Sequence, residues 1–143
     1  MTLAPSDMVC FALHSAALAV HSAYAPLLDR LGLTYPQYLV ISALKAQDGQ
    51  TVGQLGGALR LDTNTLTPLL KRMEAAGWLT RQRETADERQ VRVSLTEAGH
   101  DLARQATTVP QAFAERTGLT QSELADLRDI LLALRDRLKP TKT

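Results

Sequence analysis

The stretch from Leu61 to Leu95 constrains the fold most, because a helical apolar period is followed at once by an alternating one. Asp62 and Thr63 are short polar residues of the kind that cap a helix N-terminus. Behind them the apolar residues recur at helical spacing: Leu66, Leu69, Leu70 and Met73. Gly77 then predicts the helix end, since glycine tolerates the left-handed backbone conformation common there.

Two strand-like runs follow this helix, over residues 78–83 and 90–95, on either side of a polar turn at residues 85–89. Val91, Val93 and Leu95 alternate with polar residues, which is the period of a half-buried strand. A helix followed by such a hairpin predicts a winged helix-turn-helix, a mainly α fold with a small β-hairpin wing.

The polar face of the predicted helix carries hydroxyl, amide and cationic groups, which suit the phosphates and base edges of double-stranded DNA. The candidates for base or phosphate contacts are Thr63, Asn64, Thr65, Thr67 and Lys71, with Arg72 as a phosphate contact. Arg89 at the wing tip is expected to enter the minor groove, where the negative potential is enhanced. Asp87 is expected to orient Arg89 or a neighbouring arginine, because DNA repels a carboxylate.

The charge is distributed as a DNA-binding surface requires, although the excess is small. Between Arg60 and Arg92 there are seven Lys or Arg and five Asp or Glu, whereas the rest of the chain has nine basic and ten acidic residues. The net charge of +1 gives little nonspecific attraction to polyanions, so DNA affinity must come from the positions of the basic side chains. On charge alone, an ordinary solvated hairpin is the better interpretation.

The length and composition of the chain favour a helical cytoplasmic protein. The 143 residues allow a DNA-binding lobe with an association region, and 45% hydrophobic residues with only 4% aromatics are typical of a Leu- and Ala-rich helical chain. The N-terminus lacks the pattern of a signal peptide, and no uninterrupted apolar run approaches the ~20 residues that span a membrane. A single cysteine excludes an internal disulfide framework, and no cofactor or metal is expected.

A first helix is predicted over residues 5–31, with Ser6 at its start, a kink or break at Pro26 and an end at Gly32. Its middle is apolar on almost every side, which predicts burial against two partners, the second being another subunit. Thr34 should cap a second helix, residues 48–50 should form a turn, and residues 51–59 should form the first helix of the helix-turn-helix.

The C-terminal part is also expected to be helical. Thr96 should cap one helix that bends at Pro110, and Thr120 with Glu123 forms a capping-box pattern for a last helix to about Leu138. That helix carries a leucine stripe typical of a helical interface between two subunits; packing within one chain is the alternative. We therefore expect dimerisation helices in residues 1–33 and 97–143, and a DNA-binding lobe in residues 34–96.

Several segments together resemble the MarR family of dimeric winged-helix repressors. The similarity covers nearly the whole chain and is carried by residues 10–13, 24–40, 61–81 and 87–99. Cys10 together with LTYPQYLV at residues 33–40 resembles the organic hydroperoxide sensors (OhrR-like) within that family. The resemblance implies that Cys10 reacts with peroxide, that Tyr24 and Tyr35 hydrogen-bond it, one of them from the partner subunit, and that oxidation releases operator DNA.

The residues around Cys10 permit this chemistry without requiring it. With Ser6 as N-cap, Cys10 lies in the first turns of a helix, where the dipole favours a thiolate, and His14 one turn later can stabilise an anion. A lone cysteine on an apolar helix is, however, usually a small core residue. A metal site from Cys10, His14 and His21 is a weaker alternative, and His100 is expected to be an isolated surface residue.

Two features set this chain apart from the resembling group. His14 stands where the group usually has a tyrosine, which alters the hydrogen bonds around Cys10. No second cysteine can resolve a sulfenic acid, so the chain resembles the one-cysteine type. Oxidised Cys10 would therefore condense with a low-molecular-weight thiol, form a sulfenamide or become over-oxidised.

The sequence thus predicts a homodimeric, non-enzymatic repressor that binds a pseudo-palindromic operator and is released when an organic hydroperoxide oxidises Cys10. Two rivals stay open. One is a repressor of the same family released by a reversible phenolic-type ligand, with Cys10 incidental. The more distant one is a thiol peroxidase, which would leave the winged-helix pattern unexplained.

Overall fold

The computed structural model describes residues 2–140, which divide into two compact units at the junction of Val109 and Pro110. The elements of the first unit are a 3-10 turn Pro5–Asp7, α1 Val9–Asp29, α2 Tyr35–Ala46, β1 Gln50–Thr51, α3 Val52–Leu59, α4 Thr63–Ala75, β2 Leu79–Arg83, β3 Val91–Leu95, α5 Glu97–Gln105 and a second 3-10 turn Ala106–Thr108. The second unit holds nearly all of α6 Val109–Thr117 and all of α7 Gln121–Arg137.

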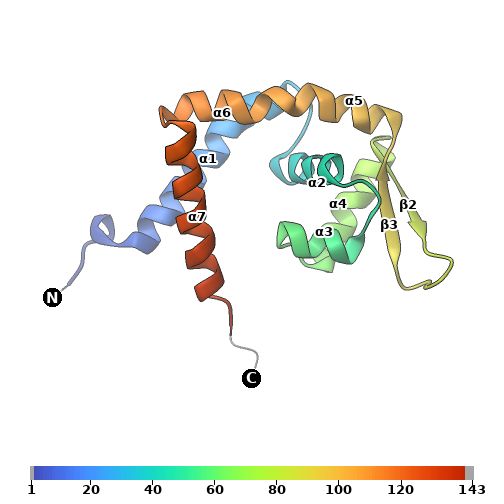
Figure 1. The fold of residues 1–143 in the computed structure, drawn as a ribbon, viewed down its shortest axis with the longest axis horizontal. Coiled ribbons are helices and arrows are strands. Elements are labelled where there is room, and N and C mark those ends of the chain that lie inside the picture. The colour runs from blue at the N-terminus through green and yellow to red at the C-terminus, as the bar shows by residue number, and fades with distance from the viewer. Residues whose placement is uncertain (1, 141–143) are drawn as a thin grey trace. The chain divides into compact units, whose positions relative to one another are not determined.

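The core of the first unit lies among α2, α3, α4 and the sheet (Figure 1). The predicted apolar stripe of α4 is confirmed, because its four members, Leu66, Leu69, Leu70 and Met73, are all at most 4% exposed. They pack with Ile41 and Leu44 of α2 and with Leu55 of α3. Two helices followed by a hairpin form the predicted winged helix-turn-helix, and the protein is mainly α as expected.

The helix ends follow the predicted polar signals. Thr34 and Thr51 each form a full capping box with a glutamine three residues later. The Asp62 carboxylate accepts a 2.8 Å hydrogen bond from the Thr65 N–H, which fixes the first turn of α4. Gly77 adopts φ +84° directly after α4, where a side chain would be strained.

The sheet has three antiparallel strands in the order β1-β3-β2, one more than predicted. The predicted turn at residues 48–50 was wrong at Gln50, which begins β1 opposite Val93. Gln50 is also buried, and its amide donates to the Ala43 and Gln47 carbonyls at 3.0 and 2.8 Å. Two residues are too few to show a strand period, and the pairing partner lies over forty residues away.

The first helix differs from its prediction at its start and at Pro26. Residues Pro5–Asp7 form a separate 3-10 turn, and α1 begins at Val9 without a side-chain cap, so Ser6 is not its N-cap. Pro26 does not break the helix, which continues to Asp29. The end near Gly32 is confirmed, since this glycine adopts φ +69° and the Leu33 N–H bonds the Leu28 carbonyl at 3.1 Å.

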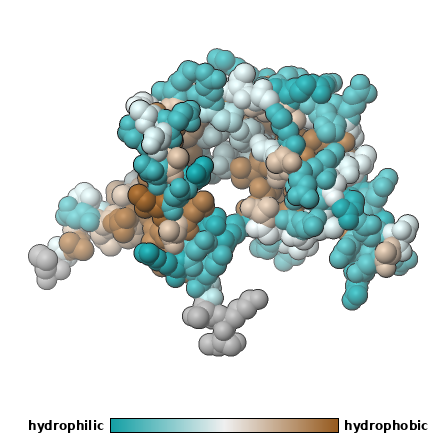
Figure 2. Space-filling view, in the orientation of Figure 1, coloured by the Kyte–Doolittle hydropathy of each residue, from teal (hydrophilic) through white to brown (hydrophobic). Residues whose placement is uncertain are grey.

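Most of α1 lies outside the core of the first unit. Within it only Leu28 is buried, whereas Val9, Phe11 and Leu18 are 70%, 48% and 59% exposed. Figure 2 shows apolar, brown surface along the N-terminal part of α1. By length and hydropathy alone, the helix also satisfies the test for a membrane span. A single exposed apolar helix near the N-terminus is weak evidence for a span, and the same surface fits the predicted packing against another subunit.

The second unit is a pair of helices. The 3-10 turn Ala106–Thr108 interrupts the helical run that Thr96 begins, and α6 starts at Val109, directly before Pro110. The bend expected at Pro110 stays a prediction. Thr120 caps α7 by accepting the Glu123 N–H at 3.1 Å, and its hydroxyl donates to the Glu123 carboxylate, so half of the expected capping box forms. No residue of α7 is buried in the described chain, and its leucine stripe is partly exposed, with Ile130 at 66%.

Candidate DNA-binding surface and cysteine site

The polar face of α4 is presented to solvent. Burial of the apolar stripe turns the opposite side outward, and five of the candidate contacts are exposed: Thr63, Asn64, Thr65, Lys71 and Arg72. Thr67 is half-buried. The residues at 63, 67 and 71 are four apart and so form one row along the helix. A row of two hydroxyls and one ammonium can donate to phosphates and base edges.

Several of the seven basic residues in this region make contacts within the lobe, among them Arg81 and Arg92. Arg81 of β2 reaches Glu74 of α4, with Nη2 3.1 Å from the carboxylate and its backbone N–H donating at 2.8 Å. This contact links α4 to the wing. The same hydrogen bonds hold the pKa of Glu74 below its usual range.

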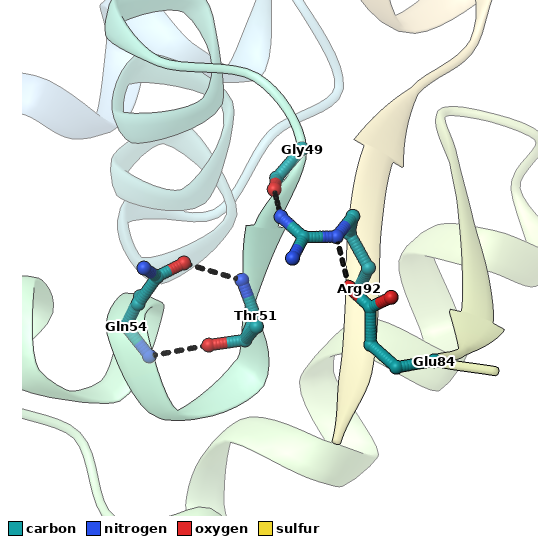
Figure 3. Close-up of polar contacts among 5 residues, drawn as sticks. All are labelled: Gly49, Thr51, Gln54, Glu84 and Arg92. Atoms are coloured by element: carbon teal, nitrogen blue, oxygen red, sulfur yellow. Dashed lines mark hydrogen bonds and ion pairs between the residues drawn. The ribbon is translucent and has the colours of Figure 1, made fainter. Parts of the chain in front are cut away.

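Arg92 of β3 joins the wing to the start of the helix-turn-helix (Figure 3). Its Nε donates to the Glu84 carboxylate, and its Nη1 donates to the Gly49 carbonyl just before β1. The neighbouring box of Thr51 and Gln54 fixes the first turn of α3, with bonds of 2.8 and 3.1 Å. Arg92 was counted among the basic residues of the DNA-binding region, and the structure gives it a scaffolding contact.

The wing tip presents one arginine to solvent. The Arg89 side chain is 92% exposed, and its Nε lies 3.4 Å from the Asp87 carboxylate. The same Asp87 oxygen accepts the Arg89 backbone N–H at 3.1 Å. The contact agrees with the expectation that Asp87 orients Arg89. Nearby, Arg83 donates to the Glu88 carbonyl at 2.9 Å and closes the loop.

Cys10 is an exposed free thiol in the second position of α1. Cys10 lies near a helix N-terminus, as expected. The helix start differs from the prediction, because α1 begins at Val9 and not at Pro5. The backbone N–H groups of a first turn have no partner within the helix and point toward an anion placed there. His14, at i+4, lies on the same side of α1 and is exposed.

The two candidate tyrosines belong to an aromatic cluster between α1 and α2. The rings of Tyr24 and Tyr35 are 5.2 Å apart, Tyr38 lies 5.9 Å from Tyr24, and the His21 imidazole lies 4.9 Å from Tyr35. Burial, with smaller contributions from the neighbouring phenols, raises the pKa of Tyr24 to about 12. Its phenol therefore remains a hydrogen-bond donor throughout the neutral range.

One chain does not bring Cys10 to these tyrosines. Cys10 and Tyr24 lie on the same continuous helix and are fourteen residues apart. At 1.5 Å per residue their separation along the axis is about 21 Å. Cys10, His14 and His21 are also spread along α1, and among residues 2–140 no group of three or more His, Cys, Asp or Glu is placed to hold a metal ion.

Sequence reasoning missed several residues that the fold brings together. His21 was considered only as a metal ligand, and Tyr38 only as an apolar helix position, yet both join the aromatic cluster. His100 is not isolated: its Nε2 lies 3.5 Å from the Asp48 carboxylate. The sequence offered no signal for these contacts, because each joins residues on two different elements.

Three comparisons place the chain among known proteins. The family model described as transcriptional regulator SarA/Rot matches residues 22–105, more than half of the chain. The regulator TtmR of Methylorubrum extorquens is 45% identical over 92% of this chain and 68% of its own length. The organic hydroperoxide resistance transcriptional regulator of Bacillus subtilis is 41% identical over 90% of this chain and 85% of its own length.

A solved structure has the same fold. Reduced AbfR bound to DNA is 34% identical, covers 92% of this chain and 90% of that chain, and superimposes with a TM-score of 0.76. These relatives are described as transcriptional regulators, and none belongs to an enzyme family.

Proposed function

Because this chain belongs to the MarR family of winged helix-turn-helix transcriptional regulators, and within it to the one-cysteine organic hydroperoxide sensors, we propose that it is a cytoplasmic repressor switched by oxidation of Cys10. The reduced protein binds operator DNA, and an organic hydroperoxide releases it. The observation that carries the proposal is an exposed cysteine at a helix N-terminus in a chain whose α4 presents a polar row to solvent.

The DNA contacts follow from the exposed surface of the lobe. The polar row of α4 enters the major groove, where Thr63, Asn64, Thr65 and Thr67 meet base edges or phosphates and Lys71 and Arg72 meet phosphates. Arg89 enters the neighbouring minor groove. Arg81 and Arg92 hold the wing against α3 and α4, so they orient these contacts.

The functional unit is a homodimer. Each of the two units of the chain exposes apolar side chains on a helix, α1 in one and α7 in the other, and a second copy buries such surfaces. Two copies related by a two-fold axis place two recognition helices on half-sites about one helical turn, roughly 10 base pairs, apart. The operator is therefore pseudo-palindromic.

The sensing site is formed between the two copies. Cys10 is about 21 Å along α1 from Tyr24 of its own chain. Tyr24 and Tyr35 contact each other, so a Cys10 that meets one of them meets both. The family resemblance implied one tyrosine from the partner, whereas the distances in this chain favour both from the partner, with His14 supplied by the subunit that carries Cys10.

The redox step is a two-electron oxidation of sulfur. The Cys10 thiolate attacks the terminal oxygen of the hydroperoxide, the O–O bond breaks, and a sulfenic acid and an alkoxide form. A low-molecular-weight thiol then condenses with the sulfenic acid, which gives a mixed disulfide and water. A bulky group in this packed interface disfavours the DNA-binding arrangement of the dimer.

The test compares wild type with Cys10→Ser. Binding to the chain's own upstream DNA is measured before and after stoichiometric cumene hydroperoxide, with intact mass recorded in parallel. Wild type should release DNA with a mass change that added thiol reverses, and Cys10→Ser should bind equally well and ignore the peroxide.

Release of Cys10→Ser by peroxide would exclude Cys10 as the sensor. Peroxide-insensitive binding of the wild type, with release by a phenolic acid, would identify the ligand-responsive rival. Catalytic turnover of peroxide with excess thiol would instead identify a thiol peroxidase.

A further inference from the structure

One face of α1 carries a continuous row of residues at alternating spacings of four and three. These are Cys10, His14, Ala17, His21, Tyr24 and Leu28. Such a heptad spacing places all of them on one side of a helix and is typical of a seam that packs against a second helix. We refer to this row as the α1 seam.

The α1 seam begins in the core and continues beyond it. Leu28 is buried and Tyr24 half-buried, whereas His21, Ala17, His14 and Cys10 are exposed. There is no charged residue between Val9 and Leu28, so little opposes covering this face. The occupant that the seam fits is a second copy of itself, since the seam continues an apolar core.

The register of the two copies follows from the contact proposed above between Cys10 and the partner's Tyr24, combined with two-fold symmetry. In a two-fold contact, residue i meets residue j and j meets i. With Cys10 against the partner's Tyr24, the midpoint falls at Ala17, whose small side chain lets two helices approach closely. Residue His21 lies one turn, about 4.5 Å along the axis, from Tyr24 and therefore next to the partner's Cys10.

The structure also holds the His21 ring in place. Its centroid is 4.9 Å from that of Tyr35 with the planes tilted by 41°, and Tyr35 in turn contacts Tyr24. The titratable groups around His21 are Tyr24 on its own helix and, on α2, Tyr35 with Tyr38 behind it. Across the seam the register adds the partner's Cys10 and the partner's His14.

We propose that His21 is the proton donor for peroxide reduction at the partner's Cys10, an inference that rests on the redox function proposed above. The thiolate takes the terminal oxygen of the hydroperoxide as the O–O bond breaks. The departing alkoxide takes a proton from the His21 imidazolium and leaves as an alcohol. Sulfur is oxidised by two electrons, the peroxide is reduced by two, and the neutral imidazole recovers its proton from water.

Tyr24 cannot replace His21 in this step. Its raised pKa, about 12, makes the phenol a poor acid in the neutral range. An imidazolium is a general acid that can donate a proton to a departing alkoxide. The tyrosines therefore position the thiolate, and His21 supplies the proton.

The experiment measures the second-order rate of Cys10 oxidation by cumene hydroperoxide from pH 5 to 8.5, by quenched intact mass and with a chelator present. His21→Gln should slow oxidation by about tenfold or more near pH 6, with the difference narrowing toward pH 8.5. The matched control His100→Gln should behave as wild type. An unchanged rate and pH profile in His21→Gln overturns the inference.

Mixed dimers test whether His21 acts across the interface. A dimer of Cys10→Ser with His21→Gln has one reactive thiol, which faces an intact His21, and should react at the wild-type rate. A dimer of wild type with the double variant Cys10→Ser/His21→Gln also has one reactive thiol. That thiol faces the substituted glutamine of the double variant and should react slowly.

The reverse pattern would assign His21 to its own subunit and overturn the inference, as would equal rates in the two mixed dimers. Failure of the redox function itself gives a different result, since wild-type Cys10 would then not be oxidised at stoichiometric peroxide. A variant that misfolds is recognised by its loss of DNA binding before peroxide is added.

Discussion

At the scale of single residues, the basic side chains of the lobe divide into two groups. Arg81 and Arg92 are held by carboxylates and carbonyls of the same lobe. Arg89 has only a 3.4 Å contact with Asp87, and its side chain is 92% exposed. A cation that the lobe already neutralises contributes little to the attraction of phosphates. The net charge of a segment therefore overstates the charge that it offers to DNA.

This division predicts the effect of Arg89→Ala. Loss of one cation in the minor groove should raise the Kd for operator DNA several-fold. The slope of log Kd against log salt concentration should become shallower by about one unit per lost contact. Fluorescence anisotropy at several salt concentrations measures both. Arg104→Ala on α5 removes the same charge from an exposed position outside the lobe and should change neither. An unaltered slope in Arg89→Ala would remove the wing from the DNA contacts.

A second residue-scale prediction concerns Glu74, whose pKa is lowered by its hydrogen bonds to Arg81. A carboxylate with a lowered pKa in the folded state stabilises that state above its unfolded pKa, about 4.3, and loses this contribution as the pH falls through the folded pKa. Glu74→Gln should therefore cost less than about 1 kcal/mol at pH 7, since the pair is partly exposed.

Urea unfolding at several pH values measures the difference between wild type and Glu74→Gln. The two curves should converge as the pH falls through the lowered pKa of Glu74. A difference that stays constant down to pH 3 would show that the amide acts through packing and not through the lost charge.

At the scale of elements, the sequence predicted those whose signals are local. The stripe of α4, the cap at Asp62 and the glycine after the helix lie within fifteen residues of one another, and all three were confirmed. The start of α1 and the strand β1 were missed. Pro5 suits the first turn of a 3-10 helix as well as that of an α-helix, and Gln50 becomes a strand residue only through pairing with Val93.

Packing between elements predicts opposite effects for two glycines. A Cβ on Gly99 of α5 would overlap the Trp78 carbonyl, whereas a Cβ on Gly57 of α3 would meet nothing within 4 Å. Gly99→Ala should therefore cost about 1–3 kcal/mol because the backbone must shift. Gly57→Ala should stabilise by up to about 1 kcal/mol through its helix propensity. Chemical denaturation measures both, and a neutral Gly99→Ala would contradict the close approach of α5 to the hairpin.

At the scale of the whole molecule, the candidate site could be predicted only in part. The family resemblance supplied Cys10, Tyr24 and Tyr35, and the structure places the two tyrosines together but leaves Cys10 at the far end of α1. Sequence spacing alone could not supply His21, because its contact with Tyr35 requires the packing of α1 on α2. In the function proposed above, a second copy of the chain completes the site.

The exposed apolar surface predicts the effect of a charge on α1. Leu18, which is 59% exposed, lies beside the proposed crossing point of two copies, so Leu18→Glu should bury an unpaired carboxylate in the dimer. Sedimentation should show a shift from dimer to monomer, and DNA affinity should fall at least tenfold because two half-sites are no longer bound together. Ala98→Glu, in the exposed first turn of α5, introduces the same charge and should leave the dimer intact.

Leu18→Glu also distinguishes between a membrane and a second copy of the chain as the environment that covers α1. If α1 inserted into a membrane, wild type would bind neutral phospholipid vesicles and Leu18→Glu would release it without altering the oligomeric state in solution. If α1 packs on a second copy, vesicles should capture neither protein, because the dimer has already covered the apolar face. His14 and His21 favour the second case, since two imidazoles in hydrocarbon would each need a polar partner that the partner chain can supply.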